Sequence, residues 1–405
     1  MELDVHGSGA QVELRLDGAP LTSLDSPPWQ ISIDLGPGLA PHELVARALD
    51  PQGGELARAR QWINMPRPPA EAGILLERDA EGRAVAAGVT WQNVMGEEPQ
   101  HVTVSFDGRP IPMDALRRVQ IPPHSTELVH VVTVELDFPS GLRSRDDVAF
   151  GGAAGGEAQS ELTAVPIRMT KKRKLNPEAF QGVLRAGEKP LRVATAEEGP
   201  ASLWIVRDES ATEAYGKLSG LGAGPLAPAA LPLEKADEVS FLWPRPRAFR
   251  GSALFPSAGG LTRANGGLTF LLSHVSNPTP EGLFPMYADA VAVAGLNAFE
   301  SFGRRAVLLV LGHAAADVST YRPEVVKKYL AMLRVPLFVW SLEEEPPAGS
   351  PWGDVAAVGT RSSLRAAYAR LRDTLDTQRI LWAQGRYLPQ EIQLVPGTTG
   401  IELVH

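Results

Sequence analysis

The chain of 405 residues carries a formal net charge of −8, and its sequence pI is near 5.6. This overall field repels nucleic acid and anionic membranes, which excludes both as general partners. With 44% hydrophobic residues the chain can bury ordinary cores. No apolar run approaches the ~18 residues of a membrane span, so we expect no transmembrane segment. The absence of cysteine excludes disulfides, thiolate metal sites and cysteine nucleophiles.

The location of the protein is open. Residues 1–10 lack the basic and apolar regions of a secretory signal. A periplasmic or extracellular location is favoured if a leader has been removed, and a cytoplasmic one otherwise. A cysteine-free composition suits a protein of the cell envelope.

The first part of the chain has the pattern of β-sandwiches. From Val12 to Val165 short runs of period two are separated by turn residues. Residues 16–21 (LDGAPL) resemble residues 106–111 (FDGRPI), each being a strand end, an Asp-Gly hairpin turn and a return strand. After a Pro-rich bend the match continues between residues 41–46 and 128–133. The repeat predicts two tandem immunoglobulin-like sandwich modules.

The predicted boundaries follow from the linkers. The Pro-rich stretch 65–69 is a natural stiff connection, which places the first module at residues 1–66 and the second at 67–158. Beyond residue 159 the pattern changes to strands that alternate with helices. This alternation predicts one doubly wound, Rossmann-like α/β domain over residues 159–405. The expected helices are 212–221, 266–274, 285–302, 322–334 and 362–377.

Residues 201–212 (ASLWIVRDESAT) carry the first chemical pattern of this second half. A run of consecutive apolar residues, typical of a strand buried on both faces, enters Asp208-x-Ser210-x-Thr212. Three hard oxygen donors then lie at the carboxyl end of a parallel strand, where open α/β sheets bind ligands.

This pattern resembles the Asp-x-Ser-x-Ser of the metal-ion-dependent adhesion site in von Willebrand factor A (VWA) domains. Further segments resemble the VWA-related proteins of Acidobacteria in the expected order: 237–242, 282–294, 304–311, 334–339 and 364–404. The resemblance implies a VWA domain, with Asp208, Ser210 and Thr212 as ligands of Mg²⁺ or Ca²⁺.

Other family positions depart from the pattern. A working adhesion site adds a threonine and an aspartate, but Phe284 lies near the expected threonine, with Thr279 a few residues away. Gly312 or His313 stands in place of the aspartate. Neutral imidazole is a poor Mg²⁺ ligand, and one carboxylate alone gives little affinity. We therefore interpret the site as degenerate, and we expect no cofactor.

Several interpretations other than a Mg²⁺ or Ca²⁺ site remain for these residues. Ser210 or Thr212 could cap the following helix while Asp208 bonds loop amides. His313 could be a packed loop histidine, a partner contact, or a Zn²⁺ ligand together with Asp208 and Asp317. Ser210 could act as a nucleophile with His313 as its base, although no Gly-x-Ser-x-Gly elbow supports that role.

We predict a non-enzymatic protein that binds another protein or a multiprotein complex. His313 and Trp352 are the candidate partner contacts, Trp352 because it stands in an exposed-looking Pro-rich loop. One alternative is a Mg²⁺- or Ca²⁺-dependent adhesion protein whose site is completed by Thr279 or Asp289. The other is a Ser/His hydrolase.

Overall fold

The protein is described by a computed structural model. The described residues are 11–26, 29–66, 70–79, 82–93, 95–125, 129–151, 158–159, 162–171, 173–208, 234, 237–246, 255–262, 264, 267–275, 284–301, 303–311, 317–345 and 348–405.

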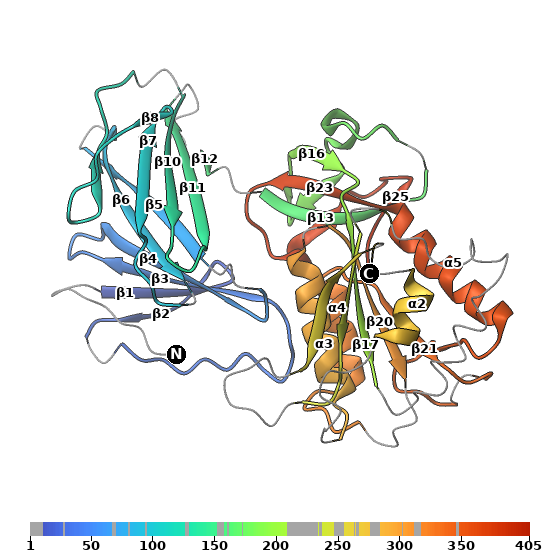
Figure 1. Ribbon diagram of the computed structural model, residues 1–405. Helices are drawn as coiled ribbons and strands as arrows, with labels where there is room; N and C mark the ends of the chain where they lie inside the picture. Colours follow the sequence, from blue (N-terminus) through green and yellow to red (C-terminus); the bar gives the residue numbers. More distant parts are fainter. Residues whose placement is uncertain are drawn as a thin grey trace.

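The chain begins with a four-stranded antiparallel sheet in the order β2-β1-β3-β4 (Figure 1). Its core is small: Val12, Leu14 and Ala46 are buried, with Trp29 and Ile31 packed against them. Ion pairs between β1, β3 and β4 join Arg47 to glutamates of this sheet. The strands are β1 (Gln11–Leu16), β2 (Ala19–Leu24), β3 (His42–Leu49) and β4 (Glu55–Ile63).

Two further antiparallel sheets share one core. Ile74 and Val89 of the three-stranded sheet β5-β6-β9 belong to the same buried cluster as Val104 and Val132 of the five-stranded sheet β12-β11-β10-β7-β8. The strands are β5 (Ala70–Arg78), β6 (Ala84–Asn93), β7 (His101–Phe106), β8 (Arg109–Pro110), β9 (Arg118–Gln120), β10 (Val129–Asp137), β11 (Arg143–Gly151) and β12 (Ala158–Gln159).

The internal repeat corresponds to one structural unit that occurs twice. The order β2-β1-β3-β4 matches β8-β7-β10-β11. Both turn aspartates have left-handed backbones, with φ 50° at Asp17 and 49° at Asp107. Each lies 2.7 Å from a histidine Nδ1, His42 in the first unit and His130 in the second. The predicted alignment of 41–46 with 128–133 is therefore wrong by one residue, because it pairs His42 with Val129.

His130 is held between two hydrogen-bond acceptors. Its Nδ1 faces the Asp107 carboxylate, and its Nε2 lies 2.9 Å from the carbonyl oxygen of Ser125. A protonated imidazole donates from both nitrogens and so satisfies both acceptors. The hydrogen bond to Asp107 raises the pKa of His130 by more than burial lowers it.

This geometry predicts a pH-dependent stability. The folded-state pKa of His130 lies above its unfolded value, so the contribution is complete below about pH 6.5 and is lost as pH rises through the folded pKa. After solvent screening we expect about 0.5–1 kcal/mol. Urea unfolding of wild type and His130→Gln should therefore differ most near pH 6 and least near pH 8. Exposed His101→Gln is the control, and a difference that stays constant with pH would contradict the assignment.

A small antiparallel layer follows, built from both ends of the C-terminal half. β13 pairs with β23 and β25, so residues near 165 lie beside residues near 380 and 402. Val165, Phe180 and Leu381 belong to its core. The sheets are β16-β23-β13-β25 and β15-β14-β24, made of β13 (Leu162–Met169), β14 (Leu184–Ala186), β15 (Lys189–Pro190), β16 (Val193–Glu197), β23 (Gln378–Gln384), β24 (Ile392–Leu394) and β25 (Ile401–Leu403).

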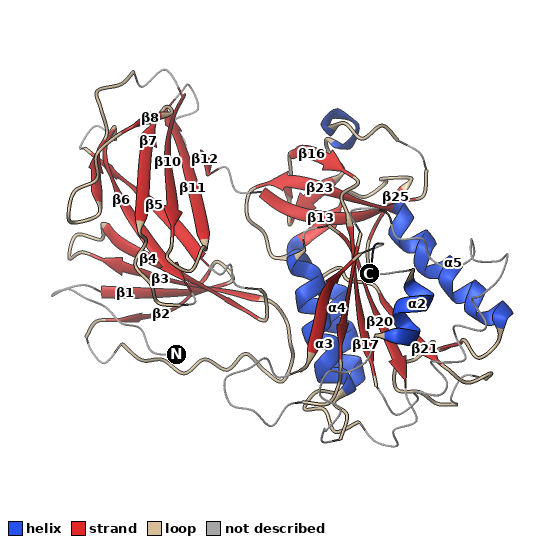
Figure 2. Cartoon of the chain, viewed as in Figure 1, coloured by secondary structure: helices blue, strands red, loops and turns tan. Residues whose placement is uncertain are grey.

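Between these strands the chain forms a six-stranded sheet in the order β19-β18-β17-β20-β21-β22, in which only β19 runs antiparallel. Helices α3 and α4 cover one face, and α2 and α5 cover the other (Figure 2). The elements are β17 (Ala201–Arg207), β18 (Glu238–Leu242), β19 (Ser257–Leu261), α2 (Leu268–His274), α3 (Tyr287–Glu300), β20 (Arg304–Leu311), α4 (Pro323–Met332), β21 (Leu337–Ser341), β22 (Ala356–Ala357) and α5 (Arg361–Thr377).

The predicted fold class, two immunoglobulin-like sandwiches followed by a doubly wound α/β VWA domain, is wrong. The structure is mostly β, with 44% strand, 18% helix and four helices among the described residues, and it has several antiparallel sheets. Strands assigned to the α/β domain pair antiparallel with each other, as β13 does with β23. The predicted helix at 212–221 lies outside the described residues. The other four predicted helices correspond to α2, α3, α4 and α5.

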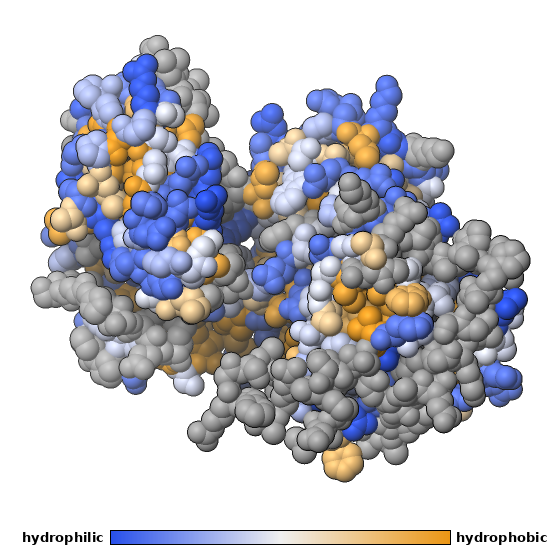
Figure 3. Space-filling view, in the orientation of Figure 1, coloured by the Kyte–Doolittle hydropathy of each residue, from blue (hydrophilic) through white to orange (hydrophobic). Residues whose placement is uncertain are grey.

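The surface is mixed in character. On the face that Figure 3 shows, hydrophilic side chains surround smaller hydrophobic patches. In the part of the chain that the structure describes, no helix is long and apolar enough to cross a membrane.

Candidate functional site

Asp208 lies where β17 ends, at the carboxyl edge of the parallel sheet. Its side chain is fully buried, with 0% exposure, because the apolar run of β17 carries it into the interior. Nε of Arg245 donates to its Oδ1 at 2.8 Å, and the Tyr287 hydroxyl donates to its Oδ2 at 3.1 Å. The two protein donors occupy both oxygens of the carboxylate.

The ion pair fixes the local charge. The hydrogen bond to Asp208 raises the pKa of Arg245 by more than burial lowers it, so the guanidinium stays charged. A divalent cation bound to Asp208 would lie beside this positive charge and would compete with it for the same oxygens. The described residues at Asp208, Arg245 and Tyr287 among them, therefore do not suit Mg²⁺ or Ca²⁺.

Asp317 and Ser319 fasten a loop to the start of α3. Asp317 accepts hydrogen bonds from the backbone N–H of Tyr287 at 2.9 Å and of Ala288 at 3.2 Å. Ser319 Oγ accepts a second bond from Ala288 at 2.9 Å. A carboxylate at a helix N-terminus satisfies free N–H groups and complements the helix dipole. Asp317 therefore acts as a helix cap.

Asp289 makes the reciprocal contact from the helix to the loop. Its carboxylate accepts from the backbone N–H of Thr320 at 2.9 Å and of Tyr321 at 3.1 Å. Its oxygens are thus used to hold the segment after residue 317. This arrangement gives Asp289 a structural role in place of the metal-ligand role considered from the sequence.

Two apolar side chains are exposed at this edge. Phe284 is 69% exposed and Val318 is 49% exposed, and the backbone N–H of Val318 donates to the carbonyl of Pro285 at 3.0 Å. The backbone N–H of Met286 also donates to the carbonyl of Pro244, next to Arg245, at 2.7 Å. We call Phe284 and Val318 the edge patch. It lies on the same group of loops as the Asp208 ion pair.

The other predicted site residues have different outcomes. Ser210, Thr212, Thr279 and His313 lie outside the described residues, so their roles stay predictions. Trp352 is only 5% exposed and packs in the core between the sheet and α3 and α4, so the expectation of an exposed loop side chain is wrong. Among the described side chains, no group of three or more histidines or carboxylates is placed to hold a metal ion.

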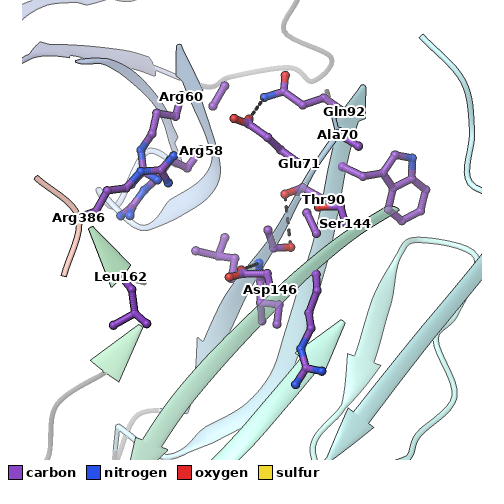
Figure 4. Close-up of a pocket in the computed structure, with 17 residues that line it drawn as sticks. Arg58, Arg60, Ala70, Glu71, Thr90, Gln92, Ser144, Asp146, Leu162 and Arg386 are labelled. Atoms are coloured by element: carbon purple, nitrogen blue, oxygen red, sulfur yellow. Dashed lines mark hydrogen bonds between the residues drawn. The ribbon is translucent and has the colours of Figure 1, made fainter. Parts of the chain in front are cut away.

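The sequence did not suggest a second feature, a cavity of about 570 Å³ where the β-strands of the first part of the chain meet residues of the C-terminal half (Figure 4). It is lined by β4, β5, β6 and β11, together with Leu162 and Arg386. The alternation of Arg58 and Arg60 was the available sequence signal, since residues two apart on a strand share a face.

Comparison with protein families and with curated proteins gives no match for this chain. The resemblance to VWA-related proteins therefore stays a prediction.

Proposed function

We propose that this chain is a non-enzymatic binding or assembly protein that docks a protein partner through the edge patch, without a bridging cation. The observation that supports it best is the pairing of Asp208 with Arg245 and Tyr287 beside an exposed Phe284. Among the described side chains of this edge, the Asp208 carboxylate is already held by Arg245, whereas Phe284 is exposed and offers apolar contact to a partner.

The loops that carry the edge patch are fastened to the domain. Asp317 caps α3, and Asp289 in turn holds the backbone after Ser319. A fixed surface loses little entropy when a partner binds, which favours affinity for a given contact area. The alternative, a Mg²⁺- or Ca²⁺-dependent adhesion protein, requires Asp208 to release Arg245 first.

Binding can be tested with a charge placed in the edge patch. The wild-type protein is immobilised on a support and incubated with an extract of the source cells. We expect it to retain the same partner whether or not EDTA is present. Phe284→Asp should reduce the retained partner about tenfold, because a carboxylate would have to be desolvated in an apolar contact. Leu116→Asp is the matched control, since Leu116 is 84% exposed but lies in another sheet region. Retention that needs Mg²⁺, or equal retention by both variants, would contradict the proposal.

A further inference from the structure

Both ring nitrogens of His130 face oxygen atoms that accept hydrogen bonds. Nδ1 lies 2.7 Å from Oδ2 of Asp107, and Nε2 lies 2.9 Å from the carbonyl oxygen of Ser125. His130 is 8% exposed and lies at the end of the sheet where β7 turns into β8 (Figure 1). Only the protonated imidazole carries two N–H groups, so it alone can donate to both oxygens at once.

Loss of the proton acts on the Ser125 side of the ring. Burial raises the pKa of Asp107, but its hydrogen bonds with His130 and with the N–H of Val131 lower it by more, so the carboxylate stays ionised at neutral pH. A charged acceptor holds a donor more strongly than a neutral carbonyl does, and the neutral imidazole therefore keeps its one proton on Nδ1. Nε2 then turns a lone pair toward the Ser125 oxygen, and repulsion replaces the hydrogen bond.

Ser125 belongs to a short loop, residues 121–125, that covers two aromatic rings. The loop starts at Ile121, whose N–H donates to a carbonyl of β6 at 3.0 Å, and continues through two consecutive prolines. The ring of His124 packs on Phe106 and Phe150, with centroid distances of 5.8 and 5.3 Å. These phenylalanines are only 9% and 2% exposed. Because the prolines restrict the backbone, we expect the loop to move as one stiff arm.

Two titratable side chains among the described residues face His130. One is Asp107, and the other is His124, whose ring lies edge-on to His130 at a centroid distance of 4.9 Å. The rings of Phe106 and Phe150 lie 5.2 and 6.1 Å away and carry no charge. A charge on His124 opposes one on His130, whereas the hydrogen bond to Asp107 raises the pKa of His130 by more than burial lowers it. His130 therefore titrates above the ~6.5 of an unperturbed histidine.

The first unit of the repeat provides an internal comparison. His42 makes the same contact, with Nδ1 2.7 Å from Oδ2 of Asp17. Among the described contacts, however, no carbonyl lies at hydrogen-bond distance from Nε2 of His42. A neutral ring is enough to satisfy Asp17. The contact to the loop is thus a feature that the second unit adds to the shared Asp–His pair.

We propose that His130 is a pH-controlled clip for the loop. While protonated, it holds Ser125 and keeps residues 121–125 over Phe106 and Phe150. When Nε2 loses its proton to solvent, the loop lifts and uncovers these rings. The aromatic surface at this end of the second unit is then open above the transition and closed below it. The clip is separate from the edge patch, so the two proposals stand or fall independently.

A fluorine label on the loop tests the clip. The chain has no cysteine, so one introduced cysteine takes a trifluoroethyl label at a single place. Ser125→Cys reports on the loop and keeps the backbone carbonyl, and Ser140→Cys, exposed between β10 and β11, is the matched control. In ¹⁹F NMR we expect the label at position 125 to move between two limiting shifts with one midpoint above about pH 6.5, and the control to stay fixed. The ¹⁵N shifts of the His130 ring should give the same midpoint.

Uncovering of the rings has its own measurement. Phe150→Cys places a thiol under the loop, and Val148→Cys places one on the same face of β11, where Val148 is also 2% exposed. The ratio of their rates with a thiol reagent removes the effect of pH on the thiol itself. We expect this ratio to rise at least about fivefold between about pH 6 and pH 8. A ratio that does not change with pH would contradict the uncovering.

Variants assign the transition to one histidine. His130→Gln should abolish the movement of the loop label, because glutamine does not titrate, whereas His42→Gln and His124→Gln should keep it. Thermal unfolding checks that each variant is folded. A transition that persists in His130→Gln, one that His124→Gln abolishes, or a label that stays fixed while the His130 ring titrates would overturn the proposal.

Discussion

Replacing Arg305 with methionine is expected to destabilise the protein by roughly 3–5 kcal/mol, because it removes a buried charge that serves three carbonyl groups. The side chain is 1% exposed. Its guanidinium donates to the carbonyls of Arg334 at 3.3 Å, Phe299 at 3.1 Å and Leu333 at 3.2 Å. Methionine fills a similar volume without donating, so the loss reports on the hydrogen bonds.

The three acceptors explain why a charge is tolerated there. Phe299 belongs to the last turn of α3, and Leu333 and Arg334 follow the last residue of α4. Helix C-termini carry unpaired carbonyls and a partial negative charge. The guanidinium also lies 4.7 Å from the Phe299 ring centroid. Burial and nearby Arg334 lower the pKa of Arg305 to about 9, so the group is still protonated at neutral pH.

Urea unfolding followed by circular dichroism measures this loss. Arg372→Met is the matched control, because Arg372 is half-exposed on α5 and pairs only with Asp376 four residues away in the described contacts. That variant should change the free energy of unfolding by less than about 0.5 kcal/mol. Equal stability of the two variants would show that Arg305 does not secure the ends of α3 and α4.

Local sequence patterns predicted elements better than their arrangement. Consecutive apolar residues identified β17 and β20 because a strand buried on both faces has no polar side to display. An alternation of apolar and polar residues, however, predicts a strand in any kind of sheet. It does not indicate which other strand pairs with it. Thr163 lies opposite Ala383, and no local pattern records a partner that distant. The predicted fold class failed for this reason.

The repeat shows a smaller failure of the same kind. Its Asp-Gly turns were visible because a left-handed aspartate and a following glycine suit a tight hairpin. The distance from aspartate to histidine is 25 residues in the first unit and 23 in the second. Because the predicted alignment followed the apolar residues, it paired His42 with Val129 and so missed His130 by one position. The Asp–His contact itself gives the register.

The contacts of the candidate site involve residues from distant parts of the chain, and no sequence motif predicts them. Asp208 was recognised from its place after a buried strand, but Arg245 follows a different strand and pairs with it only in the folded chain. Adjacent Arg304 and Arg305 have the composition of a solvated surface, yet both are buried, at 6% and 1% exposure. In both cases the neighbours that pair with the charge come from distant elements.

Replacing Asp208 with alanine is expected to cost about 2–4 kcal/mol. The variant removes the carboxylate to which the Arg245 guanidinium and the Tyr287 hydroxyl donate. We place the value below that of a fully buried pair because the Arg245 side chain is 25% exposed and water can solvate part of the released charge.

A double-mutant cycle separates this pair from the loss of packing. Arg245→Met alone should also destabilise the protein, because it removes the guanidinium that pairs with the buried Asp208 carboxylate. The double variant, Asp208→Ala with Arg245→Met, should lose less free energy of unfolding than the two single variants together, by more than about 1 kcal/mol. If the pair closes this edge to cations, millimolar Mg²⁺ or Ca²⁺ should leave the melting temperature of the wild type unchanged, because only a ligand of the folded state stabilises it. If the losses of the two single variants simply add, Asp208 and Arg245 are not coupled. If Mg²⁺ stabilises the wild type and Asp208→Ala abolishes that stabilisation, Asp208 is a metal ligand.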